Sequence, residues 1–209
     1  MSLHDDAVAV LTFWAPPDDV QARLRDRYLA RLDAASDAMT RDSRPEHLTA
    51  STLVFDPECA GVLLTLHAKA KRWFQFGGHP EADDATLLDA ARREAVEESG
   101  LAPGDLDVHP CPVRLDAHPV PFCGPDGDVW HLDVMYAAVA RPGARHAVSE
   151  ESLDVAWWPA DDVPNPELVP FVAAARKALA AQPGSADYRL GERHQMGAMA
   201  RRGRERRSG

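Results

Sequence analysis

The chain has 209 residues, enough for one domain with a sizeable core and additional segments. Its formal net charge of −10 argues against stable binding to nucleic acid, and its 45% content of hydrophobic residues is ordinary for a globular protein. No apolar run reaches the ~18 residues of a membrane span, and the acidic N-terminus lacks the basic start of a signal peptide. We therefore expect a cytoplasmic protein that does not enter a membrane.

The first part of the chain predicts one helix followed by a β-hairpin. Apolar residues recur at helical spacing over Asp18–Ala38, directly after the breaker Pro16-Pro17. The runs Leu48–Phe55 and Gly61–Leu66 are apolar and rich in β-formers, and a turn separates them. We expect these two runs to pair as antiparallel strands.

A second helix is predicted after the glycine pair Gly77-Gly78. It begins near Asp84 or Thr86, either of which can cap it, and Gly100 ends it. Apolar residues at helical spacing form its buried stripe, namely Leu87, Leu88, Ala91 and Ala95.

Three strands and a final helix are predicted beyond this point. Val108–Leu115 contains prolines that favour an edge position, whereas Trp130–Ala140 is apolar enough to be buried on both faces. Leu153–Trp158 is the third strand, and Pro166–Ala181 has the spacing of a helix. We divide the chain into an N-terminal extension with one helix (1–46), a central domain (47–182) and a basic tail without periodicity that we expect to be disordered (183–209).

The most informative stretch is the end of the second predicted helix, where three glutamates follow an arginine and precede a glycine. Glu94, Glu97 and Glu98 stand at relative positions 0, +3 and +4, which share one face of an α-helix. Like charges so close together are unfavourable unless a positive group lies among them. Mg²⁺ or Mn²⁺ is the simplest such group, because both ions prefer carboxylate oxygens. The alternative is a solvated acidic helix face with an ion pair from Arg93.

The segment from Gly77 to Leu101, GGHPEADDATLLDAARREAVEESGL, resembles the Nudix box of the Nudix hydrolases. The second half of the box matches without a gap from Arg93 to Leu101. The first half departs from the pattern, because Asp84 stands five residues after Gly78 where the box has a glutamate, and eight residues rather than seven separate Asp84 from Arg93. Either Asp84 substitutes for that glutamate with one residue inserted, or that role is lost.

The resemblance implies a fold, an activity and a metal site. The fold is an α/β (α+β) arrangement, the Nudix α/β/α sandwich with a mixed β-sheet, and the activity is metal-dependent hydrolysis of a diphosphate linkage in a nucleoside diphosphate joined to another group. Glu97 and Glu98 would bind Mg²⁺ or Mn²⁺, Glu94 would bind metal or orient the attacking water, and the Gly77 carbonyl would be a further ligand. Arg93 would hold the Glu97 carboxylate in place. The partner is then a small phosphorylated, nucleotide-like substrate, and a homodimer is also common among relatives.

Five further residues are candidates for the same cleft, and each has a structural alternative. His79 and Glu81 follow the glycine pair and are candidate substrate contacts, His79 to a phosphate or the base. Arg72 precedes the glycine pair and is placed to meet substrate phosphates. His131 lies on the Trp130–Ala140 strand, and Glu151 on the loop before the next strand is a candidate base or extra metal ligand. The structural alternatives are an orienting histidine, an exposed basic turn, a core histidine with satisfied hydrogen bonds, and solvated surface acids at Glu150 and Glu151.

Two other functions stay open. The altered first half of the box allows a Nudix-fold sensor that binds a nucleotide without hydrolysing it, although no segment is long enough for a winged-helix DNA-binding domain. The stretch Leu63–Trp73 and the tripeptide Gly78-His79-Pro80 faintly resemble isopentenyl-diphosphate isomerases. Those isomerases need a cysteine directly before the tripeptide, and this chain has Gly77 there.

Overall fold

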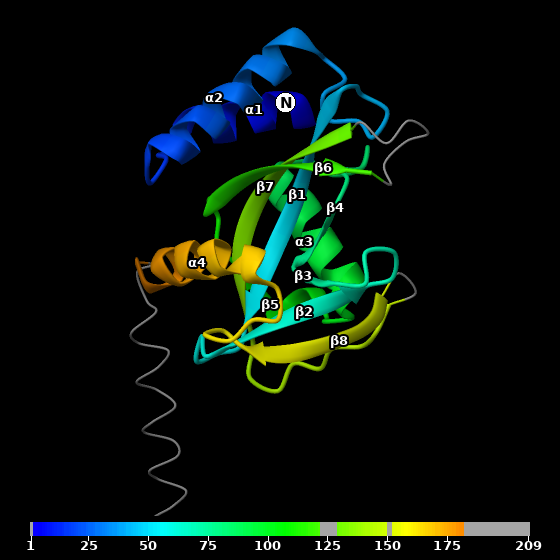
Figure 1. Ribbon diagram of the computed structural model, residues 1–209, viewed down its shortest axis with the longest axis vertical. Helices are drawn as coiled ribbons and strands as arrows, with labels where there is room; N and C mark the ends of the chain where they lie inside the picture. The colour runs from blue at the N-terminus through cyan, green and yellow to red at the C-terminus, as the bar shows by residue number, and fades with distance from the viewer. Residues whose placement is uncertain (1, 122–128, 150–151, 182–209) are drawn as a thin grey trace, which may run out of the picture.

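The computed structural model describes residues 2–121, 129–149 and 152–181, and an eight-stranded mixed sheet forms its centre (Figure 1). The strands are β1 (Glu46–Phe55), β2 (Gly61–His67), β3 (Trp73–Phe74), β4 (Phe76–Gly78), β5 (Leu106–Val108), β6 (Arg114–Val120), β7 (Val129–Ala140) and β8 (Ser152–Pro159).

The long strands β1 and β7 form the middle of the sheet and run parallel, with Glu46 opposite Trp130 and Phe55 opposite Val139. β1 also pairs antiparallel with β2 and β4, which confirms the predicted hairpin. β8 and β3 extend the sheet beyond β2, and β5 and β6 pair with β7. Nearly every residue of β1 and β7 is buried, as expected for strands covered on both faces.

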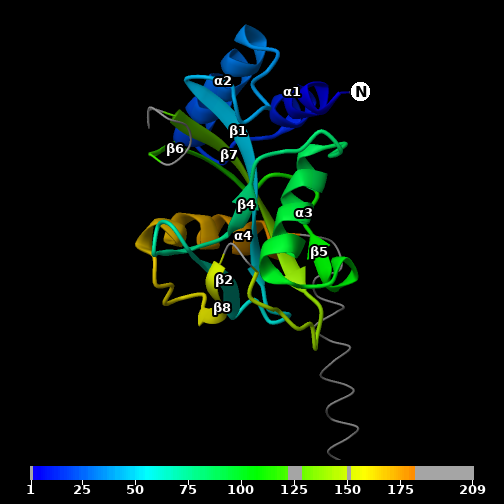
Figure 2. The same cartoon turned by 90° about the vertical axis from the view of Figure 1, so that its right-hand side faces the viewer.

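Helices cover both faces of the sheet, which confirms the sandwich (Figure 2). α3 (Leu87–Ser99) lies on one face and α4 (Val169–Ala181), which follows the 3₁₀ turn η2 (Pro166–Leu168), lies on the other. Alternate residues of β1 join different cores: Leu48 and Val54 pack in the core beneath α3, whereas Leu53 and Phe55 pack in the core beneath α4. None of the described helices is long and apolar enough to cross a bilayer.

The N-terminal segment contains two helices, where the sequence predicts only one. α1 (Leu3–Phe13) begins with a capping box between Ser2 and Asp5. α2 (Asp19–Ala34) is capped by Asp18 and ends before the predicted limit at Ala38. Tyr28 and Leu32 of α2 are buried in the same core as α3, so this segment packs on the domain.

The predicted strand Val108–Leu115 is two strands in the structure. β5 ends at Val108 after the 3₁₀ turn η1 (Pro103–Asp105), and β6 starts at Arg114. Pro110 and Pro112 lie in the gap and lack the N–H that a continuous ladder needs. Both strands pair with β7, so the prolines interrupt one edge of the sheet without changing its order.

Candidate functional site

α3 begins and ends where local chemistry dictates. The Thr86 hydroxyl accepts a hydrogen bond from the Asp89 N–H at 3.0 Å, which caps the first turn. Gly100 follows the last helical residue with φ +68°, a left-handed conformation that glycine adopts without strain. Leu87, Ala91 and Ala95 are buried against the sheet, and Glu94 and Glu98 lie beside this stripe, where they face Gly77 and Gly78 of β4.

Arg93 is the centre of a charged network formed by Asp84, Glu94 and Glu97. Its Nη2 donates to Asp84 Oδ2 and its Nη1 donates to Glu94 Oε1 and to Glu97 Oε2, each at 3.0 Å. Nη2 also donates to the main-chain carbonyl of His79 at 3.0 Å. Burial lowers the pKa of Arg93, but the bonds to Asp84 and the charge of Glu94 outweigh it and raise the pKa.

We call these four side chains the Arg93 network. Asp84, at the position where the Nudix box has a glutamate, has only 6% of its side chain exposed and accepts from the Glu81 N–H as well as from Arg93. The Glu81 carboxylate lies at the exposed margin, 3.8 Å from Arg93 Nη1. In this structure Asp84 therefore orients Arg93 and the loop before α3.

Two glutamates of α3, Glu94 and Glu98, lie against the backbone of Gly77 and Gly78. Glu98 Oε2 accepts a hydrogen bond from the Gly77 N–H at 3.0 Å. A Cβ on Gly78 would lie 2.6 Å from Glu94 Oε1, so a side chain there would displace that carboxylate. A Cβ on Gly77 would lie 2.8 Å from the Ala50 carbonyl oxygen, so glycine at this position allows β4 to pair closely with β1.

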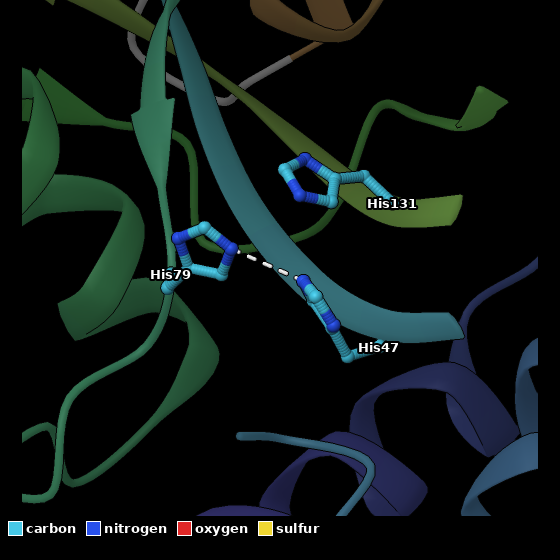
Figure 3. A group of neighbouring side chains, drawn as sticks. All are labelled: His47, His79 and His131. Carbon is cyan, nitrogen blue, oxygen red and sulfur yellow. Dashed lines mark hydrogen bonds between the residues drawn. The ribbon is translucent and has the colours of Figure 1, made fainter. Parts of the chain in front are cut away.

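A second group of side chains comes together on the sheet face opposite α3. The rings of His47 on β1, His79 after β4 and His131 on β7 point toward one another (Figure 3). Their centroids are 5.0 Å apart for His47–His79, 5.0 Å for His47–His131 and 4.9 Å for His79–His131. We call these three residues the histidine cluster. In the part of the chain that the structure describes, it is the one group of three metal-binding side chains whose ligand atoms all lie within 4.8 Å of one another.

Strand register explains why the histidine cluster forms. His47 lies opposite His131 in the parallel pair, and His131 lies opposite His118 on β6. Paired residues project to the same face of a sheet, so three histidines form a row across β1, β7 and β6. One sequence signal for this site is the alternation of polar residues along an otherwise apolar strand, at His47, Thr49 and Ser51.

A buried carboxylate lies in the next row. Asp133 accepts hydrogen bonds from Thr49 Oγ1 at 3.0 Å and from Ser51 Oγ at 2.6 Å. Burial raises its pKa, and these hydrogen bonds act in the opposite direction. On the same face of the sheet, Asp116 Oδ2 accepts a hydrogen bond from His118 Nδ1 at 2.9 Å. Burial opposes protonation of His118, but that bond and the charge of Asp133 outweigh it and raise the pKa of His118.

The histidine cluster is held in its neutral form. Burial, followed by the neighbouring histidines, lowers the pKa of His131 to about 3. Burial and His47 lower the pKa of His79 to about 4. The pKa of His47 is also lowered, mainly by burial. At neutral pH these rings therefore carry lone pairs and not charges.

The remaining predicted site residues have different positions. Arg72 donates to Asn165 Oδ1 at 2.8 Å and pairs with Glu167 at 3.1 Å, so it is engaged near η2. His131 is not a core histidine with satisfied hydrogen bonds, because its Nε2 is buried and has no partner among the described residues. Glu150 and Glu151 lie outside the described residues, as does the basic tail.

An apolar hollow of about 270 Å³ lies elsewhere, between α1 and the loop before β6. Val10, Phe13, Trp14, Cys111 and Pro112 are among its lining residues. None of its described lining residues has a charged side chain, so the hollow does not suit a phosphate group.

Comparison with known proteins identifies the family. The model for the NUDIX domain matches residues 45–181, from the start of β1 to the end of α4. Among solved structures, an Ap4A hydrolase from C. elegans in a binary complex is similar with a TM-score of 0.54 at 17% identity, covering 65% of this chain and 98% of that chain. The NUDIX domain of Shewanella oneidensis NrtR, complexed with ADP ribose, has a TM-score of 0.51 at 20% identity, covering 74% of this chain and 97% of that chain.

These two structures show a shared fold. A search of curated protein sequences gives no significant match. The family model spans well over half of the chain and includes β4, α3 and the Arg93 network. The chain therefore belongs to the NUDIX domain family.

Proposed function

We propose that this Nudix protein is a metal-dependent hydrolase that cleaves the diphosphate linkage of a nucleoside diphosphate joined to another group. The observation that carries the proposal is the position of the α3 glutamates against the glycine backbone. Glu98 is bonded to the Gly77 N–H, and Glu94 lies where a Gly78 side chain would otherwise be. Half-buried carboxylates beside an accessible backbone provide hard oxygen donors for a divalent cation.

The residues present fit Mg²⁺ or Mn²⁺ by the chemistry of their donors. Glu94, Glu97 and Glu98 would hold the ion, with the Gly77 carbonyl as a further ligand. When bound, such an ion neutralises charge on the diphosphate and lowers the pKa of a coordinated water. The chain positions the carboxylates: Arg93 holds Glu94 and Glu97 from one side, and Gly77 holds Glu98 from the other.

The Arg93 network supports hydrolase activity despite the altered box. Asp84 supplies the negative charge that fixes the Arg93 fork, since Nε and Nη2 both donate to its carboxylate. The orientation of two glutamates therefore depends on Arg93, and Arg93 in turn depends on Asp84. The proposal assigns Asp84 a positioning role.

The substrate class is inferred from chemistry and from what similar folds bind. The two solved structures are an Ap4A hydrolase and a domain complexed with ADP ribose, and both ligands are adenine nucleotides with linked phosphates. We propose a small nucleotide-like substrate on this basis. His79 and Glu81, next to the glycine pair, are candidate substrate contacts in this proposal.

A substrate panel tests the proposal. Nucleoside triphosphates including oxidised forms, ADP-ribose, NADH, dinucleoside polyphosphates, sugar nucleotides and coenzyme A are each incubated with Mg²⁺, with Mn²⁺ and with EDTA, and released phosphate or pyrophosphate is measured. Cleavage of one class that EDTA abolishes would support the hydrolase. Tight binding of a nucleotide without turnover would instead favour the sensor function.

A further inference from the structure

The histidine cluster combines three residues that lie far apart in the chain. His47 is on β1, His79 follows β4 and His131 is on β7, and their rings converge from three directions (Figure 3). His47 has no exposed surface at all. Burying the ring nitrogens of histidines costs free energy unless each nitrogen has a hydrogen-bond or metal partner.

The backbone fixes which nitrogen of His47 faces the cluster. Its Nδ1 lies 3.1 Å from the carbonyl oxygen of Ser43, which can only accept a hydrogen bond. Nδ1 therefore carries the proton, and Nε2 presents a lone pair toward His79 Nε2 at 3.1 Å. A ring N–H bonded to a backbone carbonyl is the usual outer support of a metal-binding histidine, because it orients the ring and fixes the tautomer.

His131 provides the second, independent observation. Its Nε2 is buried and has no hydrogen-bond partner within the described parts of the chain. An unpartnered buried nitrogen costs roughly 1–3 kcal/mol. A ligand bound between the three rings would satisfy this nitrogen.

We propose that His47, His79 and His131 bind one transition-metal dication, with Zn²⁺ as the preferred ion. Imidazole nitrogens suit Zn²⁺, whereas Mg²⁺ prefers oxygen, so this site differs in chemistry from the α3 glutamates. Three protein ligands leave one position of a tetrahedral ion for water or an oxygen ligand.

The geometry needs only a small adjustment to close around the ion. Zn–N bonds of about 2.0–2.1 Å in tetrahedral geometry place ligand nitrogens about 3.3 Å apart. The ligand atoms here all lie within 4.8 Å of one another, and the His47–His79 pair is already at 3.1 Å. Side-chain rotation of His131 and His79 can supply the difference, since neither ring is fully buried.

Neighbouring groups define the limits of the site. His118 lies beside His131 with ring centroids 5.7 Å apart, but its Nδ1 is bonded to Asp116. Asp133 is bonded to Thr49 and Ser51. These residues surround the site as polar neighbours, and the proposal assigns the metal bonds to the three histidines alone.

The test is a calorimetric titration of the full chain with Zn²⁺. Metal is first removed with EDTA, and the EDTA is then removed. Excess Mg²⁺ is present throughout to occupy the glutamates. We expect one equivalent of Zn²⁺ to bind, and we expect His47→Gln, His79→Gln and His131→Gln each to weaken binding by more than the roughly 10–100-fold that follows loss of an outer supporting residue. Cobalt substitution supplies a second readout, because a tetrahedral site with nitrogen ligands has strong visible absorption and octahedral oxygen sites do not.

Two controls separate this site from others. His109→Gln alters a histidine next to the exposed thiol of Cys111, a pair that can bind zinc adventitiously, and we expect unchanged affinity. Glu98→Gln alters the glutamate site, and we again expect unchanged Zn²⁺ affinity. The proposal is overturned if no saturable site is found, if Glu98→Gln removes it, or if the three histidine variants retain it while circular dichroism shows that they fold.

Discussion

The Arg93 network and the histidine cluster are neighbours along the chain at Gly78-His79, yet they are built in opposite ways. The Arg93 network is charged, lies partly in water, and comes from one helix and the loop before it. The histidine cluster is neutral and largely buried, and its residues come from three separate segments joined by the sheet. The fold thus places carboxylate oxygens and imidazole nitrogens near each other. The carboxylates of the Arg93 network are partly hydrated, whereas the imidazoles on the sheet face are largely buried.

His79 connects the two regions. Its main-chain carbonyl accepts from Arg93, while its ring belongs to the histidine cluster. His79 and the glycine pair are therefore one direct connection between the two regions. The variants below test how independent the two regions are.

The largest expected effect is on catalysis. We expect Glu98→Gln to lower turnover of a cleaved substrate about 1,000-fold, because the amide loses the charge that a metal requires. Steady-state kinetics with Mg²⁺ measures this loss, and circular dichroism checks the fold. Glu58→Gln, on the exposed β1–β2 turn, is the matched control, and full activity of Glu98→Gln would refute the assignment.

The next effect concerns stability. Arg93→Ala leaves the Asp84 carboxylate, only 6% exposed, without its charged partner, and we expect the free energy of unfolding to fall by about 3 kcal/mol. Arg93→Lys keeps the charge without the fork and should lose less. Urea denaturation measures both variants. Arg25→Ala, whose partner Asp26 is 66% exposed, should lose less than about 1 kcal/mol, and an equal loss for both alanine variants would contradict a special role for the Arg93 network.

The histidine cluster predicts a pH dependence of stability. The folded pKa of His131 is about 3, below its ordinary value of 6.5, so the unfolded chain binds the proton first as the pH falls. Stability is therefore lost from about pH 6.5 downward. We expect His131→Gln to reduce the loss between pH 7 and pH 5 by about 2 kcal/mol in metal-free protein, measured by urea denaturation at each pH. His109→Gln should show the same dependence of the unfolding free energy on pH as the wild type. The same dependence in His131→Gln would show that the folded protein protonates His131 as readily as the unfolded chain does.

The smallest effect is expected at the start of α3. Thr86→Ala removes the hydroxyl that accepts from the Asp89 N–H, and we expect a loss of about 1 kcal/mol in the free energy of unfolding. Thr86→Ser should restore most of that stability, since serine also caps helices. Thermal unfolding of the wild type, Thr86→Ala and Thr86→Ser measures these differences. Equal melting temperatures would mean that packing alone determines where the helix begins.

Local patterns allowed much of the molecule to be predicted from sequence. The α3 glutamates, the capping by Thr86 and the end at Gly100 depend on residues within a few turns of one another, and the structure has them as expected. α1 was not predicted, although Ser2 and Asp5 form a capping box at its start. The histidine cluster was missed because His47 and His131 meet only through the parallel pairing of β1 and β7, and register is not readable from one sequence.

Two predicted residues show how position decides a role. Asp84 matched the box only loosely, and in the structure it bonds Arg93 as a structural partner. Arg72 is predicted to meet phosphates because it precedes the glycine pair, and in the structure its guanidinium bonds Asn165 and Glu167. The long side chain of arginine can reach several partners, so sequence proximity alone does not place its charge.

The parallel pairing of β1 and β7 also bears on the order in which the protein folds. Contacts between residues far apart in sequence carry a large loop-closure cost and form slowly, whereas contacts inside one helix form early. The Arg93 network can assemble as soon as α3 and its preceding loop exist. The rings of His47 and His131 meet only when the two central strands have found their register, so ion binding at the histidine cluster would report on completion of the sheet.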